Sequence, residues 1–519
     1  MTRPGPGASR VGHKNPPNEE PAERAAPGRR AGTAGLYAIG AAVACFFTVA
    51  VLGPSAFVPT LAGDGGHPPY SLDAHPPPHL VIGLAAGGVL AGAAGLGLCL
   101  AAVARGWRVR PFPLVAAGLL AAVAFTFLPP SGSADHLNYA SYGRMAATGH
   151  DPYVTRAVDL PGDPVAGSPE EWRFTPSVYG PIATGSQAFA SWAGGGSVRL
   201  TVFVLSVINT LAFALTALVL YRTARSDGRR LRTALLWTCN PLLLFHLVSG
   251  AHNDVLAIAP IVAALAVFTG PSPGPRRALA AGMLAGAGAA IKLPAALAGG
   301  GPGWTLLRDA WTSRSPRAVA GLAALAGGAG AVVAVAYVLA GPHALDQVSQ
   351  ASNMVSLATP WHLVDVLLGR GEHRGVIKAG SMVLGVLLFV LLARALPKDE
   401  EDQRRIAAAL ILAWLLAAPY ELPWYDGFGW ALLALLPWTR FDWVLLAHTT
   451  ALSLAYLPAR APARIGLPES LSWLVTVVRP TVIPWTLLAV LVVLAALCLR
   501  SGRAPATGRP PRASAGSPG

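Results

Sequence analysis

The amino-acid sequence predicts an all-α polytopic membrane protein with about 13 or 14 transmembrane helices. Apolar residues make up 53% of the 519 residues and charged residues only 12%, about half the charged share of a soluble domain. The charges fall in short bursts of arginine between long uncharged stretches, as expected for bilayer spans joined by polar loops. The net charge of +14 lies mostly in tails and short loops. The positive-inside rule accounts for it, so we expect a lipid bilayer and no nucleic acid as partner.

The chain is expected to form one membrane domain over residues 35–499. Residues 1–34 are rich in Pro, Gly, Arg and Glu and lack apolar periodicity, which predicts a disordered cytoplasmic tail. Residues 500–519 are expected to form a second such tail. In the first half of the domain the predicted spans are 35–57, 80–104, 111–128, 199–221, 231–248 and 254–269.

Loop charges predict the orientation of these spans. The loops 58–79 and 129–198 are acidic, whereas 105–110 and 222–232 are rich in arginine. Because basic loops stay in the cytoplasm, we expect both termini inside and the long loop 129–198 outside.

Residues 278–306 carry Lys292 and Pro294 in the middle of an apolar run. One continuous span would leave the basic loop at 308–317 outside and give 13 passes. Two half-helices that turn at Lys292 and Pro294 return the chain to the cytoplasm and give 14 passes. We predict the second arrangement, followed by spans at 318–340, 377–397, 405–418, 427–438, 441–457 and 480–499.

The loop 129–198 is too long and polar to be a simple connector. It holds Asp135 directly after a span, a Tyr-rich helical stretch, the sequence Gly-His-Asp-Pro-Tyr at 149–153 and Tyr-Gly-Pro at 179–181. Three later motifs accompany it, and they are Gly-Ala-His-Asn-Asp at 250–254, Ile-Lys-Leu-Pro at 291–294 and Pro-Tyr-Glu-Leu-Pro-Trp-Tyr at 419–425.

Together these motifs resemble the GT-C superfamily of glycosyltransferases. More narrowly, the chain resembles the actinobacterial polyprenol-phosphate-mannose-dependent α-1,6-mannopyranosyltransferases of lipomannan synthesis. The resemblance covers residues 111 to about 430 and implies a GT-C-like bundle with 129–198 as its catalytic loop. It also implies a polyprenyl phosphate sugar donor and a glycolipid or mannan acceptor at the outer face of the cytoplasmic membrane.

By this resemblance, Asp135 is the candidate general base. A carboxylate beside the acceptor hydroxyl can take its proton, and attack opposite the phosphate inverts the configuration without a covalent intermediate. The alternative is that Asp135 merely caps the following helix, since Asp is a favoured N-cap.

The other candidate residues are assigned to substrate binding. His252 and Lys292 are expected to contact phosphate or sugar, although 252–254 could be a capping turn and Lys292 could snorkel. Trp424 and Tyr425 are candidates for sugar stacking, or belong to an interfacial aromatic belt. The remaining candidates are Asn253 and Asp254 beside His252, Arg144, Tyr179, which precedes a helix-starting proline, and Glu421.

Two other functions stay open at this point. One is a GT-C transferase of another sugar, such as arabinose, or for another acceptor. The other is a secondary transporter or lipid flippase, although transporters place ionisable groups at mid-membrane, whereas the motifs here lie at the ends of spans. No residue cluster has metal-ligand spacing, so we expect no metal and no cofactor.

The loop charges generate a test of orientation. A cysteine introduced at Ser168 should react with a membrane-impermeant thiol reagent added to intact cells, whereas one at Ser226 should react only after the membrane is opened. The reverse pattern would overturn the orientation.

Overall fold

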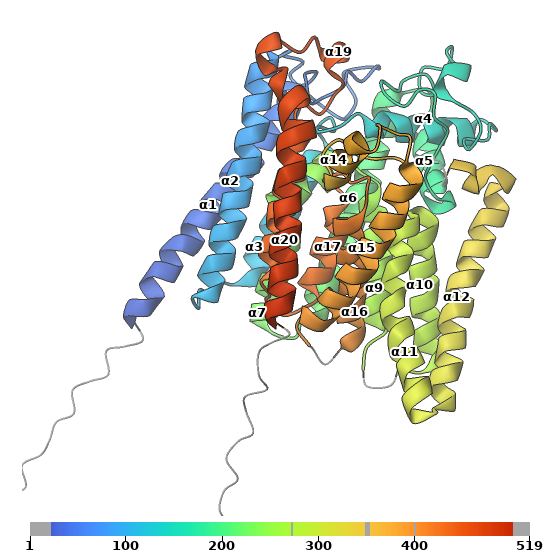
Figure 1. Ribbon diagram of the computed structural model, residues 1–519. Helices are drawn as coiled ribbons and strands as arrows, with labels where there is room; N and C mark the ends of the chain where they lie inside the picture. The colour runs from blue at the N-terminus through green and yellow to red at the C-terminus, as the bar shows by residue number, and fades with distance from the viewer. Residues whose placement is uncertain (1–21, 271–272, 348–352, 399–400, 502–519) are drawn as a thin grey trace, which may run out of the picture.

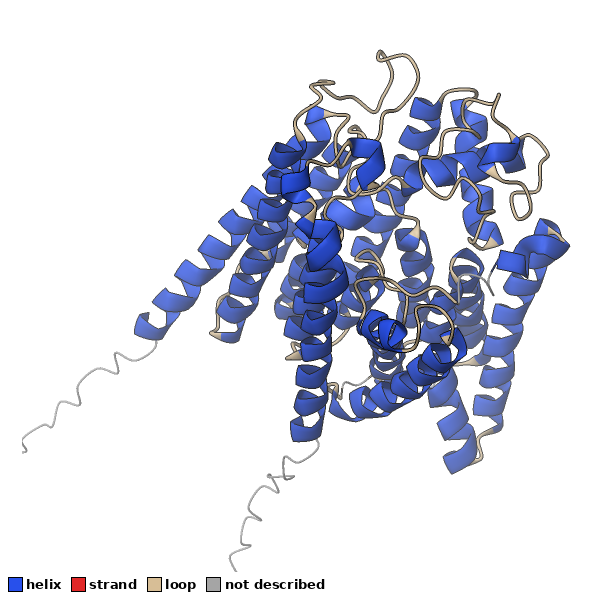
Figure 2. Ribbon diagram, turned by 45° about the horizontal axis from the view of Figure 1, so that its top comes forward, coloured by secondary structure: helices blue, strands red, loops and turns tan. Residues whose placement is uncertain are grey.

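The computed structural model describes residues 22–270, 273–347, 353–398 and 401–501. Within these ranges every regular element is a helix and no strand occurs, so the predicted all-α class is confirmed (Figure 2). Seven helical segments are long and apolar enough to cross a membrane, as a multi-pass membrane protein requires. They are Gly28–Leu52, Pro78–Ala104, Val198–Thr223, Asp227–Ser249, Pro316–Ala340, Arg374–Ala395 and Glu469–Ser501.

Four of these segments are single helices with little irregularity. They are α2 (Pro78–Ala104), α6 (Val198–Thr223), α12 (Pro316–Ala340) and α15 (Arg374–Ala395). The other three combine or extend elements, namely α1 (Ala22–Leu52), the run α7 (Asp227–Thr233), η2 (Ala234–Thr238), α8 (Pro241–Leu243) and η3 (Leu244–Ser249), and the run η6 (Glu469–Leu471), η7 (Leu474–Val482) and α20 (Ile483–Ser501).

Shorter helices stand at the remaining predicted passes. They are α3 (Pro111–Thr126), α9 (Asp254–Val267), α10 (Pro275–Ile291), α11 (Gly300–Ser313), α16 (Asp402–Ala417), α17 (Asp426–Ala434) and α18 (Phe441–Ala455). The connecting segments contain α4 (Asp135–Ala147), η1 (Ala157–Asp159), α5 (Pro181–Gly194), η5 (Pro342–Leu345), α14 (Pro360–Leu367) and α19 (Pro462–Ile465). Proline opens many of these helices because its fixed φ suits the first turn and its missing N–H costs nothing there.

The two ends of the bundle differ in character. Figure 1 shows α4, α5, α14 and α19 at one end, with the start of α1 and the finish of α20 at the other. We call the first end the loop face, since it carries residues 129–198. Both ends of the described chain therefore leave the bundle opposite the loop face.

Helix α1 begins at Ala22, so the predicted disordered tail is wrong for residues 22–34. Around Gly32, within the predicted tail, this helix packs against the turn after α2. Trp107 is buried and lies so close to Gly32 that a Cβ there would meet its ring at 2.3 Å. Residues 1–21 and 502–519, the rest of the two predicted tails, lie outside the described residues.

The two predicted half-helices in 278–306 are confirmed. Helix α10 ends at Ile291, Lys292 adopts an extended conformation, and the 3₁₀ turns of η4 (Leu293–Gly299) lead into α11. Pro294 lacks the N–H that a continuing helix needs. Small residues let α10 approach α12 closely, because a Cβ at Gly282 or Gly286 would lie 2.1 or 2.6 Å from a carbonyl oxygen of α12.

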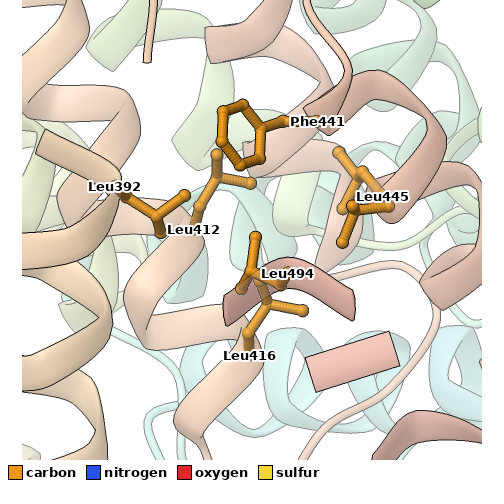
Figure 3. A pocket seen from close by; sticks show the side chains of 7 residues that line it. Leu392, Leu412, Leu416, Phe441, Leu445 and Leu494 are labelled. Carbon is orange, nitrogen blue, oxygen red and sulfur yellow. The ribbon is translucent and has the colours of Figure 1, made fainter. Parts of the chain in front are cut away.

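A small cavity lies between the helices of the C-terminal half (Figure 3). Its lining is apolar throughout and offers no group that would bind a charge or a hydroxyl. The lining residues are Leu392, Leu412, Leu416, Phe441, Val444, Leu445 and Leu494. This cavity is a packing gap, and the polar groups of interest lie elsewhere.

Gly180 docks the start of α5 against the break after α10. Its N–H donates to the Ile291 carbonyl at 3.0 Å, and a Cβ at Gly180 would lie 2.2 Å from the Ala290 carbonyl oxygen. We predict that Gly180→Ala destabilises the protein by about 1–3 kcal/mol, because backbone must move to admit the methyl group.

Gly185, one turn into α5, is the matched control, since a Cβ there meets nothing within 4 Å. Gly185→Ala should leave the thermal unfolding midpoint in detergent unchanged or raise it, because alanine favours the helix. Equal midpoints for the two variants would contradict the docking role of Gly180.

Candidate active site

The loop that leads into α4 is fixed by bonds to two other parts of the chain. The Ser131 N–H donates to the Ser249 carbonyl at 2.9 Å, and the two hydroxyls of these serines lie 2.8 Å apart. The Gly132 N–H donates to the Phe57 carbonyl at 3.0 Å. The loop is therefore held at the end of the helical segment 227–249, which is buried from Leu231 onward.

Asp135 is the first residue of α4, and the N-cap position is taken by Ala134. The alternative that Asp135 serves only as the N-cap of this helix is therefore not what the structure has. Its charge still benefits from the helix dipole in the first turn. The Asp135 side chain is 15% exposed, so it is largely enclosed but accessible to a ligand.

His252 supports Asp135 through Ser133. The Nδ1 of His252 lies 2.5 Å from the His246 carbonyl oxygen, which can only accept, so Nδ1 carries the proton. The Nε2 then accepts from the Ser133 hydroxyl at 2.9 Å, and the Ser133 oxygen accepts from the Asp135 N–H at 3.2 Å. Burial keeps the pKa of His252 well below its usual range, so the ring is neutral.

The sequence suggested that His252 contacts phosphate or sugar. In the structure both ring nitrogens are engaged within the protein, and Nε2 lies 3.7 Å from the Asp135 carboxylate. The ring face stacks on Trp424 with centroids 3.6 Å apart. Trp424 is buried, and the stacked imidazole of His252 lies on its ring, so its place in the structure is to hold His252. His252 is thus placed to position Asp135.

Lys292 forms an ion pair with Asp254 at 2.5 Å. Its ammonium also lies 3.4 Å from the centroid of the Tyr425 ring, a cation–π contact. Asp254 is 1% exposed and the Lys292 side chain 15%. Removing one partner of such a buried pair typically costs about 3–5 kcal/mol, so Asp254 fixes the ammonium beside the site.

Glu421 and Asn253 stand out because they are buried without hydrogen-bond partners among the residues that the structure describes. Each is 2% exposed, and both polar atoms of each side chain lack a hydrogen bond within the described part of the chain. Burial raises the pKa of Glu421 well above its usual range, and the nearby charge of Asp426 acts in the same direction. Burial therefore favours the protonated carboxylic acid form of Glu421.

Tyr179 belongs to a cluster of tyrosines on the α4 side of the site. Its ring packs edge-on against Tyr139 with centroids 5.1 Å apart, and the two hydroxyls are 3.4 Å apart. Tyr142 is a further neighbour of Tyr179 at 6.4 Å between centroids. This cluster forms an aromatic wall along the helix that begins with Asp135.

Arg144 is not brought into this group. It lies nine residues after Asp135 on α4, about 13 Å along a helix. Its guanidinium donates to the Asp163 carboxylate at 2.7 Å and to the Gly195 carbonyl at 3.3 Å. These bonds connect the loop 157–167 and the residue after α5 to α4, so Arg144 has a structural role.

Asp135 has a carboxyl group whose pKa is raised to about 7. Burial is the largest cause, and the charges of Glu171 and Asp254 add to it, whereas Lys292 and a hydrogen bond from Tyr139 lower the value. A base with a pKa near the working pH is the most effective, because it is largely ionised yet still basic enough to take a proton.

Sequence reasoning missed Ser133 and Glu171. Ser133 links His252 to Asp135, and Glu171 accepts from the Ala461 N–H at 2.9 Å while its charge raises the pKa of Asp135. Neighbouring Glu170 pairs instead with Arg460 at 2.5 Å. A polar residue two positions before the base was the one available signal for Ser133, and no local signal distinguishes the two glutamates.

The arrangement joins three chemical capacities at the loop face. Asp135 can accept a proton, Lys292 supplies positive charge, and Glu421 and Asn253 offer unused hydrogen-bonding groups. Among the described residues, no group of three or more His, Cys, Asp or Glu side chains is placed to hold a metal ion. This combination suits transfer chemistry on a neutral, hydroxylated substrate with an anionic leaving group.

Comparison with known proteins supplies the family. Alpha-(1->6)-mannopyranosyltransferase A of Mycobacterium tuberculosis is 28% identical over 59% of this chain and 62% of its own length. A probable alpha-(1->6)-mannopyranosyltransferase of Mycolicibacterium smegmatis is 27% identical over 62% of this chain and 64% of its own. Alpha-(1->6)-mannopyranosyltransferase A of Corynebacterium glutamicum is 28% identical over 26% of this chain and 28% of its own.

In each case the chain spans less than two thirds of the relative's length. No solved structure matches the chain significantly. Residues 37–308 match the family described as alpha-(1->6)-mannopyranosyltransferase, N-terminal domain. This range contains Asp135, the 252–254 segment and Lys292, and it covers more than half of the 519 residues. The chain belongs to the alpha-(1->6)-mannopyranosyltransferase family.

Proposed function

We propose that the protein transfers mannose from polyprenyl phosphate mannose to an α-1,6-linked mannan or glycolipid acceptor. The family and the printed names of the relatives support mannosyl transfer. The observation that carries the proposal is that Asp135 and the Lys292–Asp254 ion pair lie at the same end of the bundle, close enough for their charges to act on each other. These residues come from segments far apart in the chain.

In the proposed reaction the acceptor hydroxyl attacks the anomeric carbon of the donor. A new C–O bond forms, the bond from that carbon to the phosphate oxygen breaks, and the acceptor proton passes to Asp135. Polyprenyl phosphate leaves with the electron pair, and Lys292 stabilises its charge. Attack from the face opposite the phosphate inverts the configuration, so one base is sufficient.

His252 and Ser133 have a positioning role in this scheme. The hydrogen bond from the Asp135 N–H to Ser133, and from Ser133 to the stacked imidazole of His252, fixes the start of α4. Such support matters because a displacement of about 1 Å can cost 10²-fold in rate.

We further propose that the site faces outward. The start of α1 and the finish of α20 lie opposite the loop face (Figure 1). The arginine-rich connections 105–110 and 222–232 lie on that opposite side as well, because they follow the ends of α2 and α6 that point away from the loop face. Because basic loops stay in the cytoplasm, the loop face is then outside, where a membrane-bound sugar donor is available and a nucleotide sugar is not.

Sugar transfer is favoured over transport by the position of the site residues. Asp135 starts α4, Asp254 starts α9, and Lys292 follows α10, so these charges lie at helix ends on one face. A secondary transporter would hold its substrate near the middle of the bundle.

Asp135→Asn tests the base. Asparagine keeps the size of the side chain but cannot take the proton, so transfer from polyprenyl phosphate mannose should fall at least about 10²-fold. Donor binding should change little, because Asp135 is assigned to the acceptor. Lys292→Ala should instead weaken donor capture as well as turnover, because its charge is assigned to the phosphate.

Asp159→Asn is the control, because Asp159 pairs with Arg156 on the surface of the same loop. It should transfer at the wild-type rate. Near-normal transfer by Asp135→Asn would remove Asp135 from the mechanism and return the search for a base to Asp151, Asp254 and Glu421.

The pH dependence gives an independent test. The base acts only when ionised, so kcat/KM should rise with pH and level off above about pH 7, the value near which Asp135 titrates. Glu171→Gln removes a negative charge that raises this pKa, so the rise should move to lower pH. A profile that is identical in both proteins would show that Asp135 is not the group that titrates.

A further inference from the structure

Two fully enclosed polar side chains, Asn253 and Glu421, are unexplained by the mechanism. Both oxygens of Glu421 and both the oxygen and nitrogen of Asn253 lack a hydrogen bond within the described residues. An unmade hydrogen bond at a buried polar group costs about 1–3 kcal/mol. Native structures contain few such groups, and those that exist usually await a water or a ligand.

The fold brings together the two segments that carry these residues. Asn253 lies between His252, which stacks on Trp424, and Asp254, whose partner Lys292 lies on the Tyr425 ring. The 252–254 segment is thus joined to the 421–425 segment on both sides of Asn253. The charges of Lys292 and Asp254 also act on Glu421, so all these groups share one enclosed region.

We propose that Asn253 and Glu421 form a hydroxyl-binding subsite for the hexose ring of the lipid-linked donor. The inference rests on the proposed function and specifies how the donor sugar is recognised.

The chemistry of the two side chains favours a neutral polyol over an ion. An amide both donates and accepts, and a neutral carboxylic acid does the same, so the pair can satisfy hydroxyl groups in either role. The negative charge of Asp426 near Glu421 disfavours an anion there. The ammonium of Lys292 already neutralises Asp254, so a cation has no unpaired charge to meet at that pair.

The position of Lys292 indicates that the subsite holds the sugar of the donor and not that of the acceptor. An ammonium has three N–H donors and the bond to Asp254 uses one of them. A phosphate held by this ammonium would carry its sugar directly beside the Asn253 and Glu421 side chains. Asp135 would then face the anomeric carbon from the side of α4.

This assignment makes a hydroxyl necessary for tight recognition. A donor that lacks the hydroxyl would leave a buried polar group unpaired, which is the most effective means by which a site rejects an analogue. Substituting the protein group should remove that penalty. Sugar selectivity, and not activity alone, is therefore the informative measurement.

The experiment measures kcat/KM for polyprenyl phosphate mannose and for its 2-deoxy, 3-deoxy and 4-deoxy analogues. For the wild-type protein we expect at least one analogue to be slower by about 10- to 100-fold, the loss of one or two buried hydrogen bonds. The ratio of kcat/KM for the mannose donor to kcat/KM for the deoxy analogue measures selectivity. In Asn253→Ala and Glu421→Ala this ratio should fall toward one for the analogue that lacks the hydroxyl contacted by the substituted residue. Glu421→Gln, which can still donate and accept, should keep most of the selectivity.

A thermal unfolding measurement without ligand separates recognition from a structural role. Since neither side chain makes a hydrogen bond within the described protein, both alanine variants should unfold at or above the wild-type midpoint. Asp159→Asn is again the control and should retain the wild-type selectivity.

The outcomes are distinct. Active alanine variants that keep the full wild-type selectivity would overturn the subsite and leave the proposed function standing. A marked drop in the unfolding midpoint of both variants would assign them a structural role instead. A wild-type protein that transfers from none of these donors would refute the proposed function, and the subsite with it.

Discussion

A charged ammonium inside an apolar bundle must be paired, and the rest of this site follows from how Lys292 meets that requirement. Its partner is Asp254 at 2.5 Å, with the Tyr425 ring on the other side. To place Lys292 there, α10 has to end at Ile291 and the chain has to turn back through η4. The break that looks like an interruption of a span is therefore what brings a positive charge to the loop face.

The same constraint draws the loop segments together. Asp254 opens α9, so the residue before it, Asn253, and the stacked His252 are carried to the 421–425 segment with it. His252 in turn holds Ser133, and through it the first turn of α4. Asp135 from one segment and Lys292 from another are thereby fixed relative to each other by two aromatic contacts and a short chain of hydrogen bonds. Glu421 and Asn253 have no hydrogen-bond partner within the described part of the chain, which is the pattern of a site that gives up stability for function.

Sequence reasoning found the elements whose causes are local and missed those whose causes are distant. Lys292 and Pro294 within an apolar run are sufficient to predict the break, because both act on the backbone or charge where they stand. The packing of Gly32 in α1 against Trp107 of another segment is not revealed by any local pattern. Glu170 and Glu171 are equivalent in sequence, yet one pairs with Arg460 and the other acts on Asp135. The bond that engages the Nε2 of His252 has a distant cause too, since its partner Ser133 comes from a loop 119 residues earlier in the chain.

Charge conservation explains why a raised pKa at Asp135 and a paired Lys292 belong together in the proposed reaction. Before transfer, one negative charge lies on Asp135 and one on the phosphodiester of the donor. Afterwards Asp135 is protonated and the leaving phosphate monoester carries both charges. The site therefore gains no net charge, and what changes is its position, from α4 toward the end of α10. Burial makes the starting position unfavourable, as the pKa of about 7 shows, and Lys292 makes the final position favourable. The protein need not supply a large uncompensated charge at any stage, because it is built to move one across a short enclosed distance.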